Sequence, residues 1–439
     1  MSKSEDKKSR REKRHKEISP DRVIRWDRLD NVANLFPAIA GESMTNVYRI
    51  SVTLYETIDG ALLQQALDIV LPKMDGFNVR LRKGLFWYYF EENGKPAPTV
   101  VKEHSFPCRY IRPNKNRSYL FRVTYYERRI NLEVFHVLTD GMGGLNFLRE
   151  LTYQYLRLAH AELATAGDYL DSETSLNLED SFLRNYKRMM PRDFARKKAY
   201  LIKGRSLPEG EFGLIHGYLP ITQVKEAIKK YDISVNTYLV SCFAYSVYTV
   251  CLKRGPSDKP IRIAVPVNLR SYYDSVTTKN FFIMISAEFC PDERVYSFAE
   301  VAKCINDSLK SQMNKEHLED LFSYGVGNQK NLLLRMFPLP IKSLAMRFVY
   351  NQSATAHTST VTNIGKVQVD EAYEPYIERF HAFLTVSKAQ YLKGTICAFK
   401  DDYVFTFSTT LADTAIERAF FKQLTEDDID VTIETNGVF

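Results

Sequence analysis

Segments with the pattern of strands alternate with segments with the pattern of helices along all 439 residues, and this order restricts the fold more than any other feature. Near the start, "VYRISVTLY" (47–55) alternates apolar and polar residues as a half-buried strand does. Asp59 then caps "GALLQQALDIVL", a helix with one apolar face that Pro72 ends. Strands and helices mixed in this way predict an α/β sandwich.

Two hairpins complete the first half of the chain. The segment 78–95 reads as strand, turn, strand, and the segment 118–137 turns near Glu127 and delivers His136 at its end. A helix is expected from Leu145, because apolar residues then recur at helical spacing.

The second half shows the same alternation. A helical block is expected at 221–252, where the apolar stretch 238–252 is too short and too polar for a membrane span. The other expected elements are strands at 259–270, 280–289, 358–367 and 381–388, a hairpin around Asp401, and helices at 296–315 and 414–424. We therefore predict two subdomains of similar build, residues 23–180 and 211–439, joined by a crossover at 181–210.

The N-terminal tail, residues 1–22, is expected to be disordered because it has almost no apolar residues. Residues 1–17 hold eight Lys and Arg against four Asp and Glu, so they supply much of the net charge of +7. Such a tail aids solubility and permits weak association with an anionic membrane. No basic and aromatic module of a nucleic-acid-binding fold follows it, so nucleic acid is not an expected partner.

Cysteine usage and the charged N-terminus predict a cytoplasmic protein. The six cysteines contain no CxxC pair, which argues against a zinc ribbon or a dense disulfide framework. The N-terminal residues lack the apolar segment of a signal peptide.

The stretch "FHVLTDGMGG" (135–144) is the strongest candidate for a functional site. It places His136 at the end of an apolar strand and follows it with Asp140 and three glycines, whose missing Cβ atoms allow a tight turn or a close approach. A metal site would need further ligands, and no motif supplies them. A phosphate loop would need a Walker lysine or the GxGxxG order. A general base fits better, because a neutral imidazole accepts a proton at neutral pH and no serine or cysteine occupies a nucleophile elbow.

Residues 136–141 match the motif HxxxDG and resemble that motif of the chloramphenicol-acetyltransferase-like superfamily, which includes alcohol acetyltransferases, BAHD-type acyltransferases and condensation domains of peptide synthetases. "VPVNLR" ending at Arg270, "KNFF" ten residues later and "TVTNIG" (360–365) resemble further segments of the superfamily, so the resemblance covers roughly 30–430. Condensation domains usually have two adjacent histidines, and Phe135 replaces the first of them here. This favours a free O-acyltransferase of the alcohol acetyltransferase branch.

The resemblance implies two similar subdomains in a V-shaped pseudo-dimer, with a tunnel at their junction. His136 would be the general base that takes a proton from a hydroxyl or amine as that group attacks a thioester, with no acyl-enzyme formed. Asp140 would pair with Arg270 across the two halves, whereas a purely local interpretation has Asp140 orient His136. Gly141 would permit the turn and leave room beside the imidazole.

The remaining candidates concern the substrates. Thr362 and Asn363 are candidate donors to the oxyanion, with strand and turn hydrogen bonds as the alternative. The aromatic run "LFWYYF" (85–90) is either core or the lining of an acyl tunnel. The acyl donor would be a thioester of coenzyme A or of phosphopantetheine, and an acyl carrier protein is one candidate partner. No tightly bound cofactor or metal is expected. The chain would be a monomer. A condensation domain acting on carrier-bound substrates, or a non-catalytic lipid-binding or scaffold relative, is the alternative.

Overall fold

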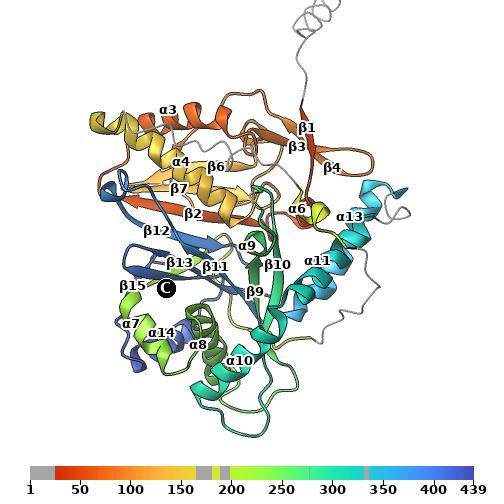
Figure 1. Cartoon of the computed structure of the whole chain (residues 1–439), viewed down its shortest axis with the longest axis vertical. Coiled ribbons are helices and arrows are strands. Elements are labelled where there is room, and N and C mark those ends of the chain that lie inside the picture. Colours follow the sequence, from red (N-terminus) through yellow and green to blue (C-terminus); the bar gives the residue numbers. More distant parts are fainter. Residues whose placement is uncertain (1–24, 165–179, 188–197, 276, 331–335) are drawn as a thin grey trace, which may run out of the picture.

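The computed structural model describes residues 25–439 except 165–179, 188–197, 276 and 331–335, so the predicted tail and part of the predicted crossover lie outside it (Figure 1). The described strands form a five-stranded sheet in the order β12-β2-β7-β6-β5, a seven-stranded sheet in the order β10-β9-β11-β13-β14-β8-β15, and a small sheet in the order β1-β4-β3. The mixed α/β architecture predicted from the sequence is confirmed. No helix in the described part of the chain is both long and apolar enough to cross a membrane.

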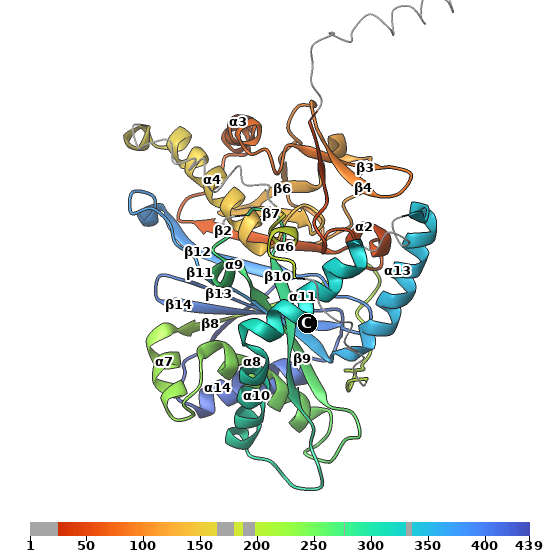
Figure 2. The same ribbon diagram turned by 45° about the vertical axis from the view of Figure 1, so that its right-hand side comes forward.

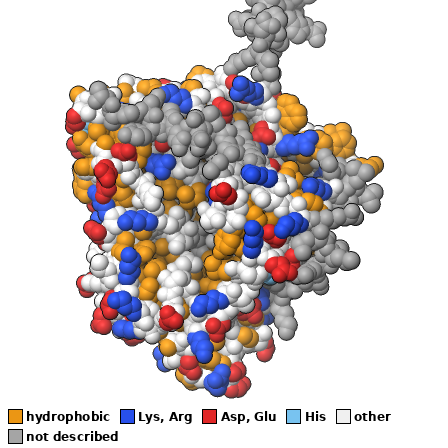
Figure 3. Space-filling model, in the orientation of Figure 1, with side chains coloured by type: hydrophobic (Ala, Val, Ile, Leu, Met, Phe, Trp, Pro, Cys, Tyr) orange, Lys and Arg blue, Asp and Glu red, His pale blue; other side chains and the backbone are white. Residues whose placement is uncertain are grey.

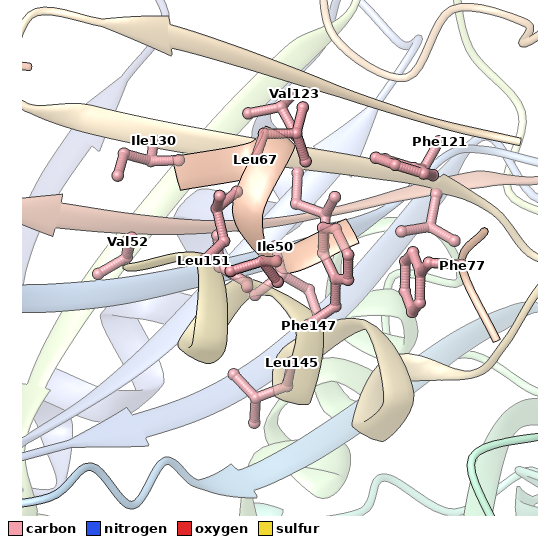
Figure 4. Close-up of a cluster of buried hydrophobic side chains, with 14 of the residues drawn as sticks. Ile50, Val52, Leu67, Phe77, Phe121, Val123, Ile130, Leu145, Phe147 and Leu151 are labelled. Atoms are coloured by element: carbon pink, nitrogen blue, oxygen red, sulfur yellow. The ribbon is translucent and has the colours of Figure 1, made fainter. Parts of the chain in front are cut away.

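The five-stranded sheet carries the N-terminal half. Its strands are β2 (Val47–Leu54), β5 (Val101–Lys102), β6 (Phe121–Tyr126), β7 (Arg129–Phe135) and β12 (Ile377–Leu384). Helices α3 (Gly60–Val70) and α4 (Gly141–Ala159) cover one face of this sheet (Figures 1 and 2). The predicted cap of α3 is present, because the Asp59 carboxylate accepts hydrogen bonds from the backbone N–H groups of Ala61 and Leu62. Between the sheet and the helices, aliphatic and aromatic side chains form a continuous core (Figure 4).

The seven-stranded sheet carries the C-terminal half. Its strands are β8 (Gly213–Pro220), β9 (Ile261–Asn268), β10 (Phe282–Phe289), β11 (Ser359–Lys366), β13 (Leu392–Phe399), β14 (Asp402–Thr409) and β15 (Thr432–Thr435). The helices of this half are α7 (Ile221–Lys229), α8 (Val235–Val250), α9 (Arg270–Tyr273), α10 (Phe298–Gln312), α11 (Lys315–Lys330), α13 (Leu339–Ser353) and α14 (Ala415–Glu426). The helical block expected at 221–252 is two helices, because Asp232 has a positive φ of 50° and Ser234 caps α8 anew. As predicted, α8 is a buried helix.

One strand crosses between the halves. Strand β12, which the sequence assigned to the C-terminal subdomain, pairs antiparallel with β2 and forms the edge of the N-terminal sheet. It also packs against β13 and β14, so it connects the two sheets. The division of the chain at residue 211 therefore does not describe the sheets, because the periodicity of a strand cannot tell which neighbour it will pair with.

Strand β2 is buried on both faces, whereas its alternating pattern predicted a half-buried strand. Its polar face lies toward the C-terminal half, and Arg49 there binds Glu133 at 2.9 Å and also Glu103. Burial alone would raise the pKa of Glu133, but Arg49 and Arg122 outweigh it and hold that pKa below its usual range. The polar residues of β2 thus form a buried ionic network rather than a solvated face.

The first hairpin does not join either large sheet. Strands β3 (Val79–Lys83) and β4 (Tyr88–Glu92) pair with each other and with β1 (Trp26–Arg28). Of the aromatic run at 85–90, Phe90 is buried, but Leu85 is 68% and Trp87 41% exposed. The interpretation of this run as core is therefore wrong for the hairpin tip, because its turn projects beyond the small sheet (Figure 1). Its role as the lining of an acyl tunnel stays a prediction.

Removing Glu133 should destabilise the fold strongly. The change Glu133→Ala leaves Arg49 and Arg122 short of one buried partner, and breaking a buried ion pair from one side costs about 3 kcal/mol or more in free energy of unfolding. Urea denaturation measures this cost. The control Glu226→Ala, which removes an exposed pair with Lys229, should change the stability by less than about 0.5 kcal/mol. Equal losses in the two variants would contradict the role given to the network.

Candidate active site

His136 follows β7 directly, and its ring lies in an aromatic surround. Its backbone N–H donates to the carbonyl of Asn46 at 2.9 Å. The imidazole stacks on Phe36 of α2 (Phe36–Ile39) with ring centroids 4.7 Å apart and meets Tyr48 edge-on at 5.1 Å. Among residues 131–140, His136 alone is not fully buried, so its ring can be reached from outside.

Asn280 holds the imidazole in one tautomer. The amide nitrogen Nδ2 of Asn280 donates to Asp30 Oδ2 at 2.9 Å, so its oxygen Oδ1 is the atom 3.1 Å from His136 Nδ1. That oxygen can only accept, which puts the proton of the neutral ring on Nδ1 and leaves Nε2 with a free lone pair. Nε2 forms no hydrogen bond with any described residue. The geometry thus orients the ring and leaves Nε2 able to accept a proton.

The surroundings keep the imidazole neutral. Burial lowers the pKa of His136 below its usual 6.5, and the nearby cation Lys393 of β13 lowers it further, whereas Asp140 and Asn280 raise it. Lys393 is itself buried, and burial lowers its pKa to about 8. Within the described residues its ammonium group makes no hydrogen bond or ion pair. Neither Lys393 nor Asp30 was predicted from the sequence, because neither belongs to a motif, whereas Asn280 lies within the quoted "KNFF" segment.

Asp140 and Arg270 form a two-pronged ion pair across the two halves. Arg270 NH1 donates to Asp140 Oδ2 at 2.8 Å and NH2 to Oδ1 at 3.1 Å, over 130 residues of sequence. The same guanidinium binds the carbonyls of Thr277 and Lys279, and Asp140 Oδ2 also accepts from the backbone N–H of Phe281. The carboxylate of Asp140 therefore accepts hydrogen bonds from Arg270 and the backbone, while the imidazole of His136 is hydrogen-bonded to Asn280. The local interpretation, in which Asp140 orients His136, does not describe the structure.

Asp140 also begins helix α4. Its Oδ1 accepts from the N–H groups of Met142 and Gly143, so the helix begins at Gly141 and not near Leu145 as predicted. The tight approaches are at the later glycines: a Cβ on Gly143 would lie 1.9 Å from Thr139 Oγ1, and one on Gly144 would lie 2.6 Å from Tyr48 Oη. Gly141 is the first helical residue rather than a turn, and a Cβ there would meet Ile364 of β11 at 3.3 Å.

The two candidate oxyanion donors lie on opposite faces of β11. Thr362 pairs with Thr395 of β13, on the face that also carries Ile364 and so lies toward the HxxxDG loop. Asn363 is exposed, its Oδ1 accepts from the Gly365 N–H at 2.7 Å and its amide reaches Asn236 of α8. Asn363 therefore has the turn hydrogen bond that was its alternative, and only Thr362 stays a candidate donor.

A polar cavity of about 970 Å³ lies between the halves, lined by residues of β2, β7, β8, β12 and β15. His136 is not among its lining residues, so the tunnel past His136 stays a prediction. In the described part of the chain, no group of three or more His, Cys, Asp or Glu side chains is arranged to hold a metal ion.

Comparison with solved structures identifies the fold. TRI101 of F. graminearum, crystallised with coenzyme A and T-2 mycotoxin, aligns with a TM-score of 0.63 at 12% identity, over 93% of this chain and 99% of that one. The protein has the chloramphenicol-acetyltransferase-like fold. A similar alignment is found with polyketide synthase associated protein 5 from Mycobacterium tuberculosis, with a TM-score of 0.58 at 14% identity over 91% of this chain and 97% of that one. The condensation domain of the monacolin K polyketide synthase MokA aligns with a TM-score of 0.56 at 12% identity over 92% of this chain and 96% of that one. No family model and no curated protein sequence matches the chain.

A double-mutant cycle tests the Asp140–Arg270 pair. Asp140→Ala and Arg270→Ala should each lower the free energy of unfolding by ~3–5 kcal/mol, because each leaves one buried charge without its partner. The double variant should lose much less than the sum, since the second change removes a charge that is already unpaired. Urea denaturation of the four proteins measures the coupling.

The variant Asp140→Asn separates the ion pair from the helix cap. Asparagine caps a helix about as well as aspartate, so this variant should keep the cap of α4. It loses the charge, and its amide NH2 replaces the oxygen Oδ2 that accepts from Arg270 and from the Phe281 N–H. Strictly additive losses in the cycle, or an Asp140→Asn protein as stable as the parent, would rule out the pairing as a stabilising interaction.

Proposed function

We propose that the protein is an acyltransferase, which moves an acyl group from a thioester to a hydroxyl or amine. The supporting observation is the His136 ring, whose Nδ1 is bound to Asn280 while Nε2 is unbonded and reachable. The solved structures with this fold add support, because one was crystallised with coenzyme A and a mycotoxin and another is a condensation domain. The donor is accordingly a thioester of coenzyme A or of a carrier-bound phosphopantetheine.

The proposed reaction needs no acyl-enzyme. Nε2 of His136 takes the proton of the acceptor as its oxygen or nitrogen attacks the thioester carbonyl, and a tetrahedral intermediate forms. The carbon–sulfur bond then breaks, and the imidazolium returns the proton to the departing thiolate. The products are an ester or amide and a free thiol. Asn280 stabilises the imidazolium stage, because its oxygen accepts the Nδ1 proton throughout.

Two groups are proposed to stabilise the negative oxygen of the intermediate. Thr362 has a hydroxyl on the face of β11 toward the HxxxDG loop, and a donor placed there would favour the intermediate over the substrate. Lys393 lies on the same face of the neighbouring strand and adds a positive charge near His136. Asp140 and Arg270 act on position only, because their charged groups bind each other and the backbone.

A condensation reaction between carrier-bound substrates is the second candidate, since condensation domains share the fold. Phe135 argues against it, because this fully buried side chain occupies the position of the first of the two histidines that condensation domains usually have. A non-catalytic relative would have no need of an oriented, accessible imidazole.

Replacing His136 should abolish most of the activity without unfolding the protein. We expect His136→Ala to lower turnover by roughly 10²–10⁴, because a general base contributes about that factor. Thiol release from a panel of acyl-coenzyme A donors, with alcohols and amines as acceptors, measures turnover, and a thermal melt verifies the fold. A folded His136→Ala protein with the parent's turnover would show that His136 is not the base.

The pH profile should report the charge of Lys393. The neutral imidazole is the active form, so kcat/KM should fall as the pH drops through the lowered pKa of His136. With a pKa of about 8, Lys393 is cationic in that range and holds the pKa of His136 down. Lys393→Met should therefore move the acid limb of the profile to higher pH.

An exposed lysine on the neighbouring strand supplies the matched control. Lys366→Met removes the same charge at an exposed position of β11 and should leave the acid limb in place. A limb that does not move in Lys393→Met, or that moves equally in both variants, would contradict the electrostatic role of Lys393.

A further inference from the structure

Helix α13 presents an apolar surface to solvent. Six side chains of this helix and of residues 336–337, which precede its N-cap Pro338, are between 49% (Phe337) and 70% (Leu344) exposed. They are Met336, Phe337, Ile341, Leu344, Phe348 and Val349, and we refer to them as the α13 face. A contiguous exposed surface of this kind marks a site of interaction.

Helix α13 turns its apolar side toward solvent, whereas an ordinary surface helix turns that side toward the core. At 100° per residue its outward apolar positions, Ile341, Leu344, Ala345, Phe348 and Val349, fall within an arc of about 140°. Lys342 lies about 20° beyond one edge of this arc, and Arg347 lies about 60° beyond the other. An apolar stripe bordered by cations on both sides is the pattern of a helix that lies in the interface of a membrane.

The tip of the β3–β4 hairpin extends the α13 face. The Leu339 N–H donates to the carbonyl of Leu85 at 2.8 Å, and Lys342 Nζ donates to that of Phe86 at 2.9 Å, so the tip is fixed beside the helix. Both views place the tip next to α13 (Figures 1 and 2), and hydrophobic side chains gather on the surface where the hairpin projects (Figure 3). Trp87, exposed at this tip, is a residue type that favours the boundary between lipid and water.

The helix that carries the α13 face has positive charges only. Residues 336–353 contain two cations, Lys342 and Arg347, and no Asp or Glu. The hairpin, residues 79–92, contains three Lys and Arg and two Glu, and Glu91 binds Arg80 and Arg82. An anionic surface would therefore meet cations and no carboxylate from the helix. A second copy of the same face would bring two positive borders together, which disfavours self-association.

We propose that the α13 face and the β3–β4 hairpin tip dock on an anionic lipid bilayer. The apolar side chains enter the boundary between headgroups and acyl chains, while Lys342 and Arg347 stay at the level of the phosphates. Docking would bring the candidate active site close to the membrane. Arg347 Nε donates to the carbonyl of Ala38 in α2, and Phe36 of the same helix stacks on His136. The inference rests on the surface alone and holds whichever reaction the site performs.

Flotation of the full-length protein with lipid vesicles tests the proposal. The probes are vesicles of phosphatidylcholine alone and vesicles that also contain about 30 mol% phosphatidylserine. We expect binding to the anionic vesicles that weakens as salt is raised. Leu344→Ser with Phe348→Ser should reduce this binding at least tenfold, because burial of either side chain in lipid is worth about a factor of ten or more. Both residues are exposed, so the thermal melt should not change.

A matched control removes apolar side chains elsewhere. Val295→Ser with Met313→Ser changes two exposed apolar residues outside both segments and should leave vesicle binding intact. In a Trp26→Phe protein, Trp87 is the single tryptophan, and its emission should shift to the blue on anionic vesicles.

Three outcomes would overturn the proposal. The first is that the parent protein does not bind anionic vesicles. The second is that the Leu344→Ser, Phe348→Ser protein binds as well as the parent, which would assign binding to the basic tail. The third is a dimer in sedimentation velocity that this variant abolishes while vesicle binding is absent, which would make the α13 face an interface between copies of the chain.

Discussion

The ion pair between Asp140 and Arg270 is the interaction on which the rest of the site depends. One carboxylate caps helix α4, binds the guanidinium and accepts the Phe281 N–H, so the HxxxDG loop, the start of a helix and the segment after β9 are held at one point. A buried charge is tolerated only where its partners are complete, and here both oxygens of Asp140 have at least two donors. Any shift of one half against the other would leave these charges unpaired.

The position of the imidazole follows from that anchor. Because Arg270 also binds the carbonyls of Thr277 and Lys279, it shapes the segment that presents Asn280 to His136. Asp30, buried and with a pKa that burial raises to about 6, binds both nitrogens of Asn280 and fixes the direction of its amide. The contacts of Asp30 with Asn280 and of Asn280 with His136 join three segments that are far apart in sequence, and they decide which nitrogen of His136 carries the proton.

Two elements of the structure reverse the usual distribution of polar and apolar residues. The polar face of β2 is buried, and the ion pairs among Arg49, Glu103 and Glu133 offset the cost of burying its charge. The apolar face of α13, by contrast, is exposed. Burying charges without partners and exposing a large apolar face are both unfavourable for an isolated chain. The first reversal is explained by the contact between the halves, and the second is the observation from which the docking on a membrane is proposed.

Local patterns in the sequence determined most elements and one side of the site. Alternation and helical spacing located β2, α3, the hairpin that ends at His136 and α8, because these patterns reflect neighbours a few residues apart. The resemblance of two separate motifs to one superfamily anticipated the ion pair. The role of His136 as a base, the oxyanion donor Thr362 and the identity of the substrates stay predictions.

Only the tertiary structure decided the contacts between distant segments. It placed β12 in the sheet of the other half, turned Asn363 away from the HxxxDG loop, and brought Asp30, Asn280 and Lys393 to His136. It also decided that the tip residues Leu85 and Trp87 are exposed. The periodicity of a segment states which of its faces is apolar, but not what that face will meet, because that depends on how elements hundreds of residues apart pack together.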